Sequence, residues 1–240
     1  MNTRKNLLLL TIVFILTGLI SGCSLNSGYN NVNNIPNKTD NTGNKGNNSG
    51  TTLDLSNKNL TAFPTDILAN TNLTKLILSN NQLTTLPAEI GNLSNLKELY
   101  INGNKLSGAL PAEIRKMRLE ILDASHNGMS GIPAEIGQLN NLKRLDYSYN
   151  QFDTMPMEIK NLQNLDYLSL AYNNYRQIPV ELLEVSSLKT LDFSYNKLGV
   201  LPGDMKSLKS LNTLILTGNN LPNTEIEKVK IFLPNTKIIN

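Results

Sequence analysis

One histidine and three tyrosines recur along the chain at steps of 23 residues: His126, Tyr149, Tyr172 and Tyr195. Their types favour binding, because an exposed tyrosine offers a large apolar area together with a polar tip. An aspartate stands three residues before three of the four, at Asp123, Asp146 and Asp192. Carboxylates beside the rings favour a ligand with basic or hydroxyl-rich groups.

His126 is the only histidine of the chain and the residue best suited to act as a general base. Asp123 and Ser125 lie close to it in the sequence. Ser125 and His126 are consecutive, however, so in a strand their side chains are expected to diverge, and no oxyanion-hole element accompanies them. The chain has no GxxxxGK[ST] or HExxH motif, and its carboxylates lack the spacing of a calcium loop. We therefore expect no enzymatic activity, no metal and no cofactor.

The first 22 residues differ in composition from the rest of the chain. Two positive charges precede an apolar run of 14 residues, Leu7–Ile20. At about 1.5 Å per residue, this run is too short to cross a bilayer core of roughly 30 Å comfortably. A charged start, a short apolar middle and small residues after it are typical of a secretory signal. We expect residues 1–22 to be a signal peptide.

Cys23 is the only cysteine, which excludes an internal disulfide and a zinc site built on cysteines. The junction Leu19-Ile20-Ser21-Gly22-Cys23 resembles the bacterial lipobox. The resemblance implies that Cys23 is lipidated, and more than one acyl chain gives stable anchoring. Since Ser24 rather than an aspartate follows, it also implies the outer membrane of a bacterial cell envelope, on a side that the sequence leaves open. The alternative is an ordinary signal peptide with a stray cysteine.

Residues 23–50 are expected to form a disordered tether. Ser24–Gly50 holds ten asparagines in 27 residues, and its apolar residues are too few to bury a core. A flexible chain of this length has an r.m.s. span of roughly 30 Å, enough to hold a domain off a membrane. The formal charge of the whole chain is only +3, so nothing in its composition calls for a nucleic-acid partner.

From Thr51 onward the sequence repeats with a fixed period. The pattern LxxLxLxxN begins every 23 residues, at Leu73, Leu96, Leu119, Leu142, Leu165, Leu188 and Leu211. A constant period indicates repeat architecture. Apolar residues at positions 4 and 6 alternate with their neighbours, which predicts one short strand per repeat. The asparagine at position 9 has both donors and an acceptor, and is expected to bond backbone groups where the chain leaves the strand.

This pattern resembles the leucine-rich repeat family, in its 23-residue bacterial class, from Thr51 to Asn240. The resemblance implies an α/β leucine-rich repeat solenoid, a horseshoe with a parallel β-sheet on the concave face and short helical or irregular segments on the convex face. The tail Ile226–Ile238 resembles the C-terminal cap of bacterial surface members. We therefore expect a leucine-rich repeat domain over residues 51–240, with a cap from about residue 222.

In such a solenoid, positions 3, 5, 7 and 8 of each repeat are expected to point outward on the concave face. Position 8 then places His126 and the three tyrosines on four successive turns, about 4.8 Å apart. Two further tyrosines, Tyr100 at position 5 and Tyr167 at position 3, join the candidate binding residues. Tyr147 and Phe193 occupy position 6 and are expected in the core.

The sequence thus predicts a lipid-anchored binding module of a bacterial envelope. It would recognise a protein or peptide, from the envelope or from a host, through the concave face. Two alternatives stay open: the same residues would suit a glycan or cell-wall ligand, or the stacked rings would only stabilise the sheet of a structural protein, by about 0.2–1 kcal/mol per pair. Neither the identity of the partner nor the oligomeric state follows from the sequence.

Overall fold

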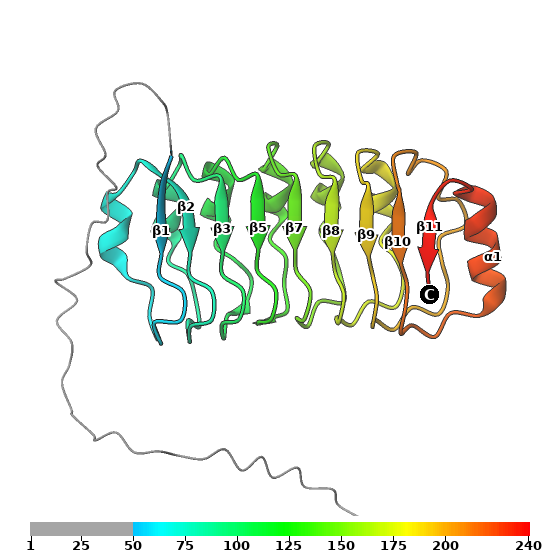
Figure 1. Cartoon of the computed structure of the whole chain (residues 1–240), viewed down its shortest axis with the longest axis horizontal. Helices are drawn as coiled ribbons and strands as arrows, with labels where there is room; N and C mark the ends of the chain where they lie inside the picture. Colours follow the sequence, from blue (N-terminus) through cyan, green and yellow to red (C-terminus); the bar gives the residue numbers. More distant parts are fainter. Residues whose placement is uncertain (1–49) are drawn as a thin grey trace, which may run out of the picture. The chain divides into compact units, whose positions relative to one another are not determined.

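The computed structural model describes residues 50–240, and these form a stack of turns around one sheet (Figure 1). All neighbouring strands run parallel. The strands of the sheet, in spatial order, are β1 (Thr51–Asp54), β2 (Leu73–Ile77), β3 (Glu98–Tyr100), β5 (Ile121–Asp123), β7 (Arg144–Asp146), β8 (Tyr167–Ser169), β9 (Thr190–Asp192), β10 (Thr213–Ile215) and β11 (Lys237–Ile239). The fold predicted from the period is confirmed.

The register of the sheet follows the period of the sequence. Leu122 on β5 pairs with Leu145 on β7, and Leu145 pairs with Leu168 on β8, so the same repeat position always meets itself. These leucines are fully buried, and so are Tyr147 and Phe193, as predicted. Each fully buried leucine is worth about 1.5–3 kcal/mol, and every repeat adds the same set.

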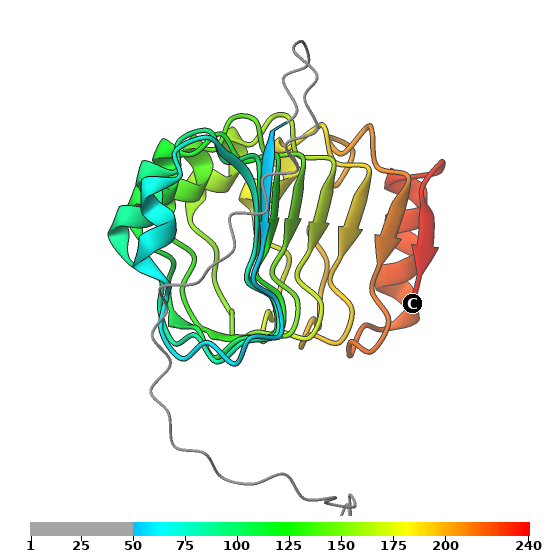
Figure 2. The ribbon, with the colours of Figure 1, turned by 60° about the vertical axis from the view of Figure 1, so that its left-hand side comes forward.

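The side of the solenoid opposite the sheet is built from short 3-10 helices (Figure 2). Each begins directly after a proline, whose φ of −57° to −75° is the value that its ring imposes. The helices are η1 (Thr65–Ala69), η2 (Ala88–Asn92), η3 (Ala112–Lys116), η4 (Ala134–Gln138), η5 (Met157–Asn161) and η6 (Val180–Glu184). A separate two-stranded sheet joins β4 (Ser107–Gly108) to β6 (Gly128–Met129).

The last turn contains the one α-helix of residues 50–240, α1 (Asn223–Phe232), followed by strand β11. Ile226 and Val229 of α1 are buried. The carboxylate of Glu225 accepts a hydrogen bond of 2.9 Å from the backbone N–H of Leu201, which ties the helix to the preceding repeat. This segment falls where the sequence led us to expect a cap.

A row of asparagines, which we call the asparagine ladder, runs through the solenoid behind the strand ends; five of its members are buried, and Asn127 and Asn219 are half-buried. In a typical rung, the Asn150 Oδ1 accepts from the N–H of Met129, and its Nδ2 donates to the carbonyls of Ala124 and Tyr147, all at 3.0–3.1 Å. Equivalent bonds recur in all seven full repeats, at Asn81, Asn104, Asn127, Asn150, Asn173, Asn196 and Asn219. The predicted structural role of these residues is confirmed.

Candidate functional site

The residue before each ladder asparagine adopts a left-handed backbone conformation. Its φ lies between 52° and 75° in all seven full repeats, at Asn80, Gly103, His126, Tyr149, Tyr172, Tyr195 and Gly218. Asn57, at the same position of the incomplete first repeat, has a φ of 57°. Glycine tolerates this region and asparagine and histidine are enriched in it, whereas for a bulky residue such as tyrosine it is an outlier that costs roughly 1–2 kcal/mol. Four successive repeats nevertheless place a ring there.

These four rings form a continuous stack, which we call the aromatic ladder. Its members are His126, Tyr149, Tyr172 and Tyr195. Successive ring centroids are 3.9, 4.1 and 4.2 Å apart, with interplanar angles of 12–14°. The tyrosines keep 38–47% of their surface exposed. The rings thus lie closer together than the strands that carry them, which are about 4.8 Å apart.

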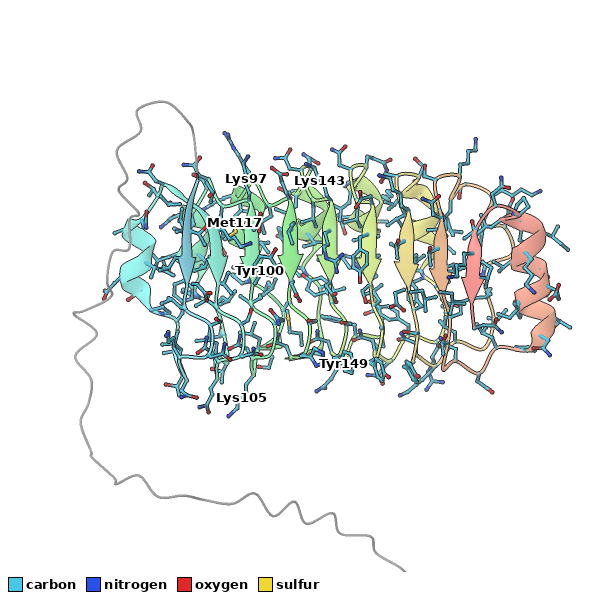
Figure 3. All side chains as sticks on the ribbon, in the orientation of Figure 1. Lys97, Tyr100, Lys105, Met117, Lys143 and Tyr149 are labelled. Atoms are coloured by element: carbon cyan, nitrogen blue, oxygen red, sulfur yellow. The ribbon has the colours of Figure 1, made fainter. Side chains whose placement is uncertain are left out.

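The aromatic ladder lies beyond the strand ends, and this corrects the prediction that it points outward on the concave face. Strand β7 ends at Asp146, three residues before Tyr149. Figure 3 shows Tyr149 on the lower rim of the solenoid, on the same rim as Lys105, whereas Tyr100 lies over the strands. The prediction was wrong because the alternation of a strand stops where the left-handed turn begins.

Face-to-face stacking decides what the aromatic ladder can offer to a ligand. The faces of Tyr149 and Tyr172 are covered by their neighbours, so these residues present ring edges and hydroxyls. Ring edges carry the positive end of the aromatic quadrupole. The adjacent hydroxyls of Tyr149 and Tyr195 also raise the pKa of Tyr172 to about 12, so it stays a neutral donor.

Gly218 lies at the C-terminal end of the aromatic ladder and allows the last ring to lean over the next repeat. A Cβ built on Gly218 would be 2.5 Å from the Cδ1 of Tyr195, too close for any real contact. With a φ of 75°, Gly218 is also in a conformation that favours glycine. At the other end of the stack, the repeat before that of His126 has Gly103 at this position, so no side chain continues the stack beyond His126.

The three predicted aspartates form a separate row on the sheet. Asp146 accepts hydrogen bonds from the backbone N–H and the hydroxyl of Ser148, at 3.0 and 2.7 Å. Asp123 and Asp192 are held by the serines two residues later. Burial raises the pKa of Asp146, although the Ser148 bonds oppose the shift. The serines at position 7 are themselves buried, and the hydroxyls of Ser125 and Ser148 donate to the aspartates of their own repeats.

The two remaining predicted tyrosines each lie with a cation on the sheet, apart from the aromatic ladder. The Tyr100 hydroxyl donates to Glu98 at 3.0 Å, and the Lys75 ammonium is 4.9 Å from its ring centroid. The guanidinium carbon of Arg144 is 3.6 Å from the ring centroid of Tyr167. The predicted site residues thus separate into a rim group and a sheet group.

Two comparisons with known proteins agree with this architecture. A family profile of leucine-rich repeats in two copies matches residues 71–112, and a leucine-rich repeat profile matches residues 163–221. The structure of a leucine-rich repeat protein from Leptospira interrogans has 36% identity and a TM-score of 0.69, over 78% of this chain and 53% of that one. The two profiles and the solved structure support the leucine-rich repeat family for this chain.

Other solved structures are also similar to this leucine-rich repeat protein. Internalin C2 from Listeria monocytogenes is 26% identical, with a TM-score of 0.66 and 79% of each chain covered. The leucine-rich repeat ectodomain of an Arabidopsis thaliana membrane receptor kinase, in complex with Casparian strip integrity factor 2, is 32% identical, with a TM-score of 0.68 over 78% of this chain and 23% of that one. The chain therefore spans about half of the Leptospira protein and a quarter of the plant ectodomain. A search of curated protein sequences finds no match.

Leucine-rich repeat proteins are typically binding scaffolds rather than enzymes, and the surroundings of His126 agree with that use. The Ser125 hydroxyl donates to Asp123 at 2.7 Å, while the His126 ring stacks on Tyr149. Ser125 and His126 lie after the end of β5, not within the strand as expected. Within residues 50–240, no group of three or more His, Cys, Asp and Glu side chains could hold a metal ion.

The rim opposite the aromatic ladder carries a row of ion pairs that was not predicted from the sequence. Glu120 lies between Lys97 at 3.5 Å and Lys143 at 2.7 Å, and Asp166 pairs with Lys189 at 3.4 Å. Figure 3 shows Lys97 and Lys143 on this upper rim. The lysines hold the pKa of Glu120 below its usual value. The alternation of sign at position 2 of successive repeats was the available signal.

The predicted lipidation site, Cys23, lies outside the described residues, as do the signal peptide and nearly all of the tether. Among the helices that the structure describes, none is long and apolar enough to cross a membrane.

Proposed function

We propose that this leucine-rich repeat protein is a lipid-anchored component of a bacterial envelope that recognises a protein or peptide through its aromatic ladder. The observation that carries the proposal is the left-handed backbone at the four rings. Other repeats of the same solenoid meet that demand with asparagine or glycine, without the cost of roughly 1–2 kcal/mol. Strain retained at exposed residues supports a role in function.

The partner that suits this surface is extended and crosses successive repeats along the lower rim. It would meet a new ring every 3.9–4.2 Å, each offering an apolar edge and, for the tyrosines, a hydroxyl. Tyrosines of this kind are typical of binding hot spots. Leucine-rich repeat proteins generally mediate protein or peptide recognition, and the plant ectodomain above is in complex with another factor.

The glycan alternative draws no support from this geometry. Stacking of a sugar needs a free ring face, and the faces of Tyr149 and Tyr172 are covered by their neighbours. A purely structural role accounts for the rings only through their stacking, worth about 0.5–1.5 kcal/mol per pair, whereas asparagine serves the same turn elsewhere without strain. The binding test below distinguishes this structural role from recognition of a partner.

The envelope location rests on the N-terminal sequence. Cys23, the sole cysteine, follows a signal-like segment in a lipobox-like junction, and Ser24 after it favours the outer membrane. An acyl anchor followed by an asparagine-rich tether would hold the solenoid clear of the membrane surface. Changing Cys23→Ser should move the protein from the membrane fraction to the soluble one and abolish incorporation of a labelled fatty acid. Unchanged fractionation would refute the anchor.

The binding proposal is tested by changing Tyr149, Tyr172 and Tyr195 together to asparagine, which accepts the left-handed backbone. Crosslinking in intact cells, read by mass spectrometry, should show a partner that the wild type captures and the variant loses. The control changes three exposed apolar residues elsewhere, Met157, Val180 and Val200, to alanine. It should retain the partner. Identical captures by wild type and ladder variant would contradict the proposal and favour a structural role.

A further inference from the structure

Arg144 on strand β7 is held on the sheet by two different groups. Its guanidinium carbon lies 3.6 Å from the ring centroid of Tyr167 on β8. Its Nη2 lies 3.9 Å from the Oδ2 of Asp146, two residues away on its own strand. An aromatic face and a carboxylate are the two groups that bind a guanidinium most strongly, one through the ring quadrupole and the other through charge.

The ion pair between Arg144 and Asp146 is loose. A separation of 3.9 Å is too long for a hydrogen bond, so the Oδ2 of Asp146 is incompletely satisfied by Arg144. The other oxygen of Asp146 is already bonded by Ser148. The Asp146 side chain is only 16% exposed, and this burial raises its pKa. The Arg144 side chain is 46% exposed, so solvent reaches it while it lies on the Tyr167 ring.

A second cation on the same sheet shows what a closed arrangement looks like. Lys75 pairs with Glu98 at 2.7 Å, and the Tyr100 hydroxyl donates to the same Glu98 oxygen at 3.0 Å. The Lys75 ammonium is 4.9 Å from the centroid of the Tyr100 ring. There the carboxylate holds the cation at hydrogen-bond distance, and the ring is the more distant partner. At Arg144 the ring contact is close and the carboxylate is left open.

We propose that Tyr167 and Asp146 form a guanidinium-binding site, which Arg144 fills in the free protein and an arginine side chain of the partner takes over on binding. That the incoming arginine belongs to a protein or peptide rests on the function proposed above, whereas the site itself does not. Because Arg144 competes for the same ring face, it lowers the apparent affinity by the fraction of molecules in which the site is open. When Arg144 moves away, the Oδ2 of Asp146 loses its nearby cation, and the guanidinium of the incoming arginine can take that place.

The substitution that opens the site is Arg144→Thr, since Thr190 on β9 and Thr213 on β10 hold the same repeat position in this sheet. The probe is N-acetyl-arginine amide, titrated while NMR signals of labelled tyrosine rings are followed. We expect it to bind Arg144→Thr about tenfold more tightly than the wild type, a gain between those of an exposed and of a desolvated cation–π contact. The shift should occur at the Tyr167 ring, and N-acetyl-lysine amide should bind more weakly.

Two variants make this result specific. Lys143→Thr removes a neighbouring positive charge but leaves Arg144 in place, so it should show no gain in affinity for the probe. Adding Tyr167→Leu to Arg144→Thr removes the ring face and should abolish the gain. Equal binding by wild type and Arg144→Thr, an equal gain for the lysine probe, or a gain that survives Tyr167→Leu would overturn the site.

The same titration on the ladder variant separates this inference from the proposed function. Changing the three ladder tyrosines to asparagine leaves Tyr167 and Asp146 untouched, so opening the site in that background should give the same tenfold gain. If partner capture proves independent of the aromatic ladder while the probe still binds, only the proposed function fails. If the partner is lost but Arg144→Thr gives no gain, only the guanidinium-binding site fails.

Discussion

The asparagine ladder and the aromatic ladder occupy adjacent positions of the same repeat and behave in opposite ways. Asn150 is 8% exposed and bonds the backbone of its own and the preceding repeat, whereas Tyr149 beside it is 41% exposed and contacts other rings. Asparagine recurs at its position in all seven full repeats, while the preceding position varies among asparagine, glycine, histidine and tyrosine. Constancy within the chain marks a structural demand, and variation marks a side chain free for recognition.

The reason is that the backbone makes a different demand at each position. At position 9, every turn leaves buried backbone groups that need both a donor and an acceptor, and asparagine supplies both. At position 8, the turn requires only a left-handed conformation and leaves the direction and type of the side chain open. Substitutions at the two positions should therefore differ in size and in kind.

The largest effect is expected for Asn150→Ala. This change leaves the buried N–H of Met129 without its acceptor and removes the three hydrogen bonds from Nδ2 to the carbonyls of Ala124, Tyr147 and Ser148. The free energy of unfolding should fall by about 3 kcal/mol, as measured by chemical denaturation, since an unsatisfied buried donor alone costs about 1–3 kcal/mol. Asn140→Ala, an exposed asparagine outside the ladder, should change it by less than about 0.5 kcal/mol. Equal losses in the two variants would show that the asparagine ladder makes no special contribution to stability.

A smaller loss, about 2 kcal/mol, is expected for Gly218→Ala, because the left-handed backbone costs roughly 1–2 kcal/mol and the new methyl group displaces the Tyr195 ring. Denaturation gives the energy, and NMR of the Tyr195 ring reports whether it leaves the stack. Gly199→Ala serves as the control, since no atom lies within 4 Å of the added Cβ. A stable variant with an unmoved Tyr195 would show that Gly218 does not set the end of the aromatic ladder.

The smallest change in stability is expected for Tyr172→Asn, within about 1 kcal/mol of the wild type. Relief of left-handed strain, roughly 1–2 kcal/mol, offsets the loss of two stacked pairs worth about 0.5–1.5 kcal/mol each. Tyr172→Val removes the same ring but keeps the strain, so it should be clearly less stable than the asparagine variant in the same denaturation assay. If both variants lose the same stability, stacking rather than strain governs this position.

The repeat part of the fold was predictable because its information is local. Alternation at positions 4 and 6 decided which side chains enter the core, and burial of Leu145 and Tyr147 confirms it. The direction of Tyr149 was not predicted, because alternation was extended past a strand of only three residues. The signal was present in the sequence, since glycine and asparagine at the same position of other repeats indicate a left-handed turn.

By itself, the sequence determined the period, the register and the inward faces of the strands, because a 23-residue repeat brings the same position to the same place in each turn. It also determined which residues are aromatic or acidic. Only the tertiary structure decided that the four rings leave the sheet for the rim, that their faces cover one another, and that Arg144 lies on Tyr167. These contacts join side chains from neighbouring turns, so they depend on backbone angles and distances between strands that no single repeat encodes.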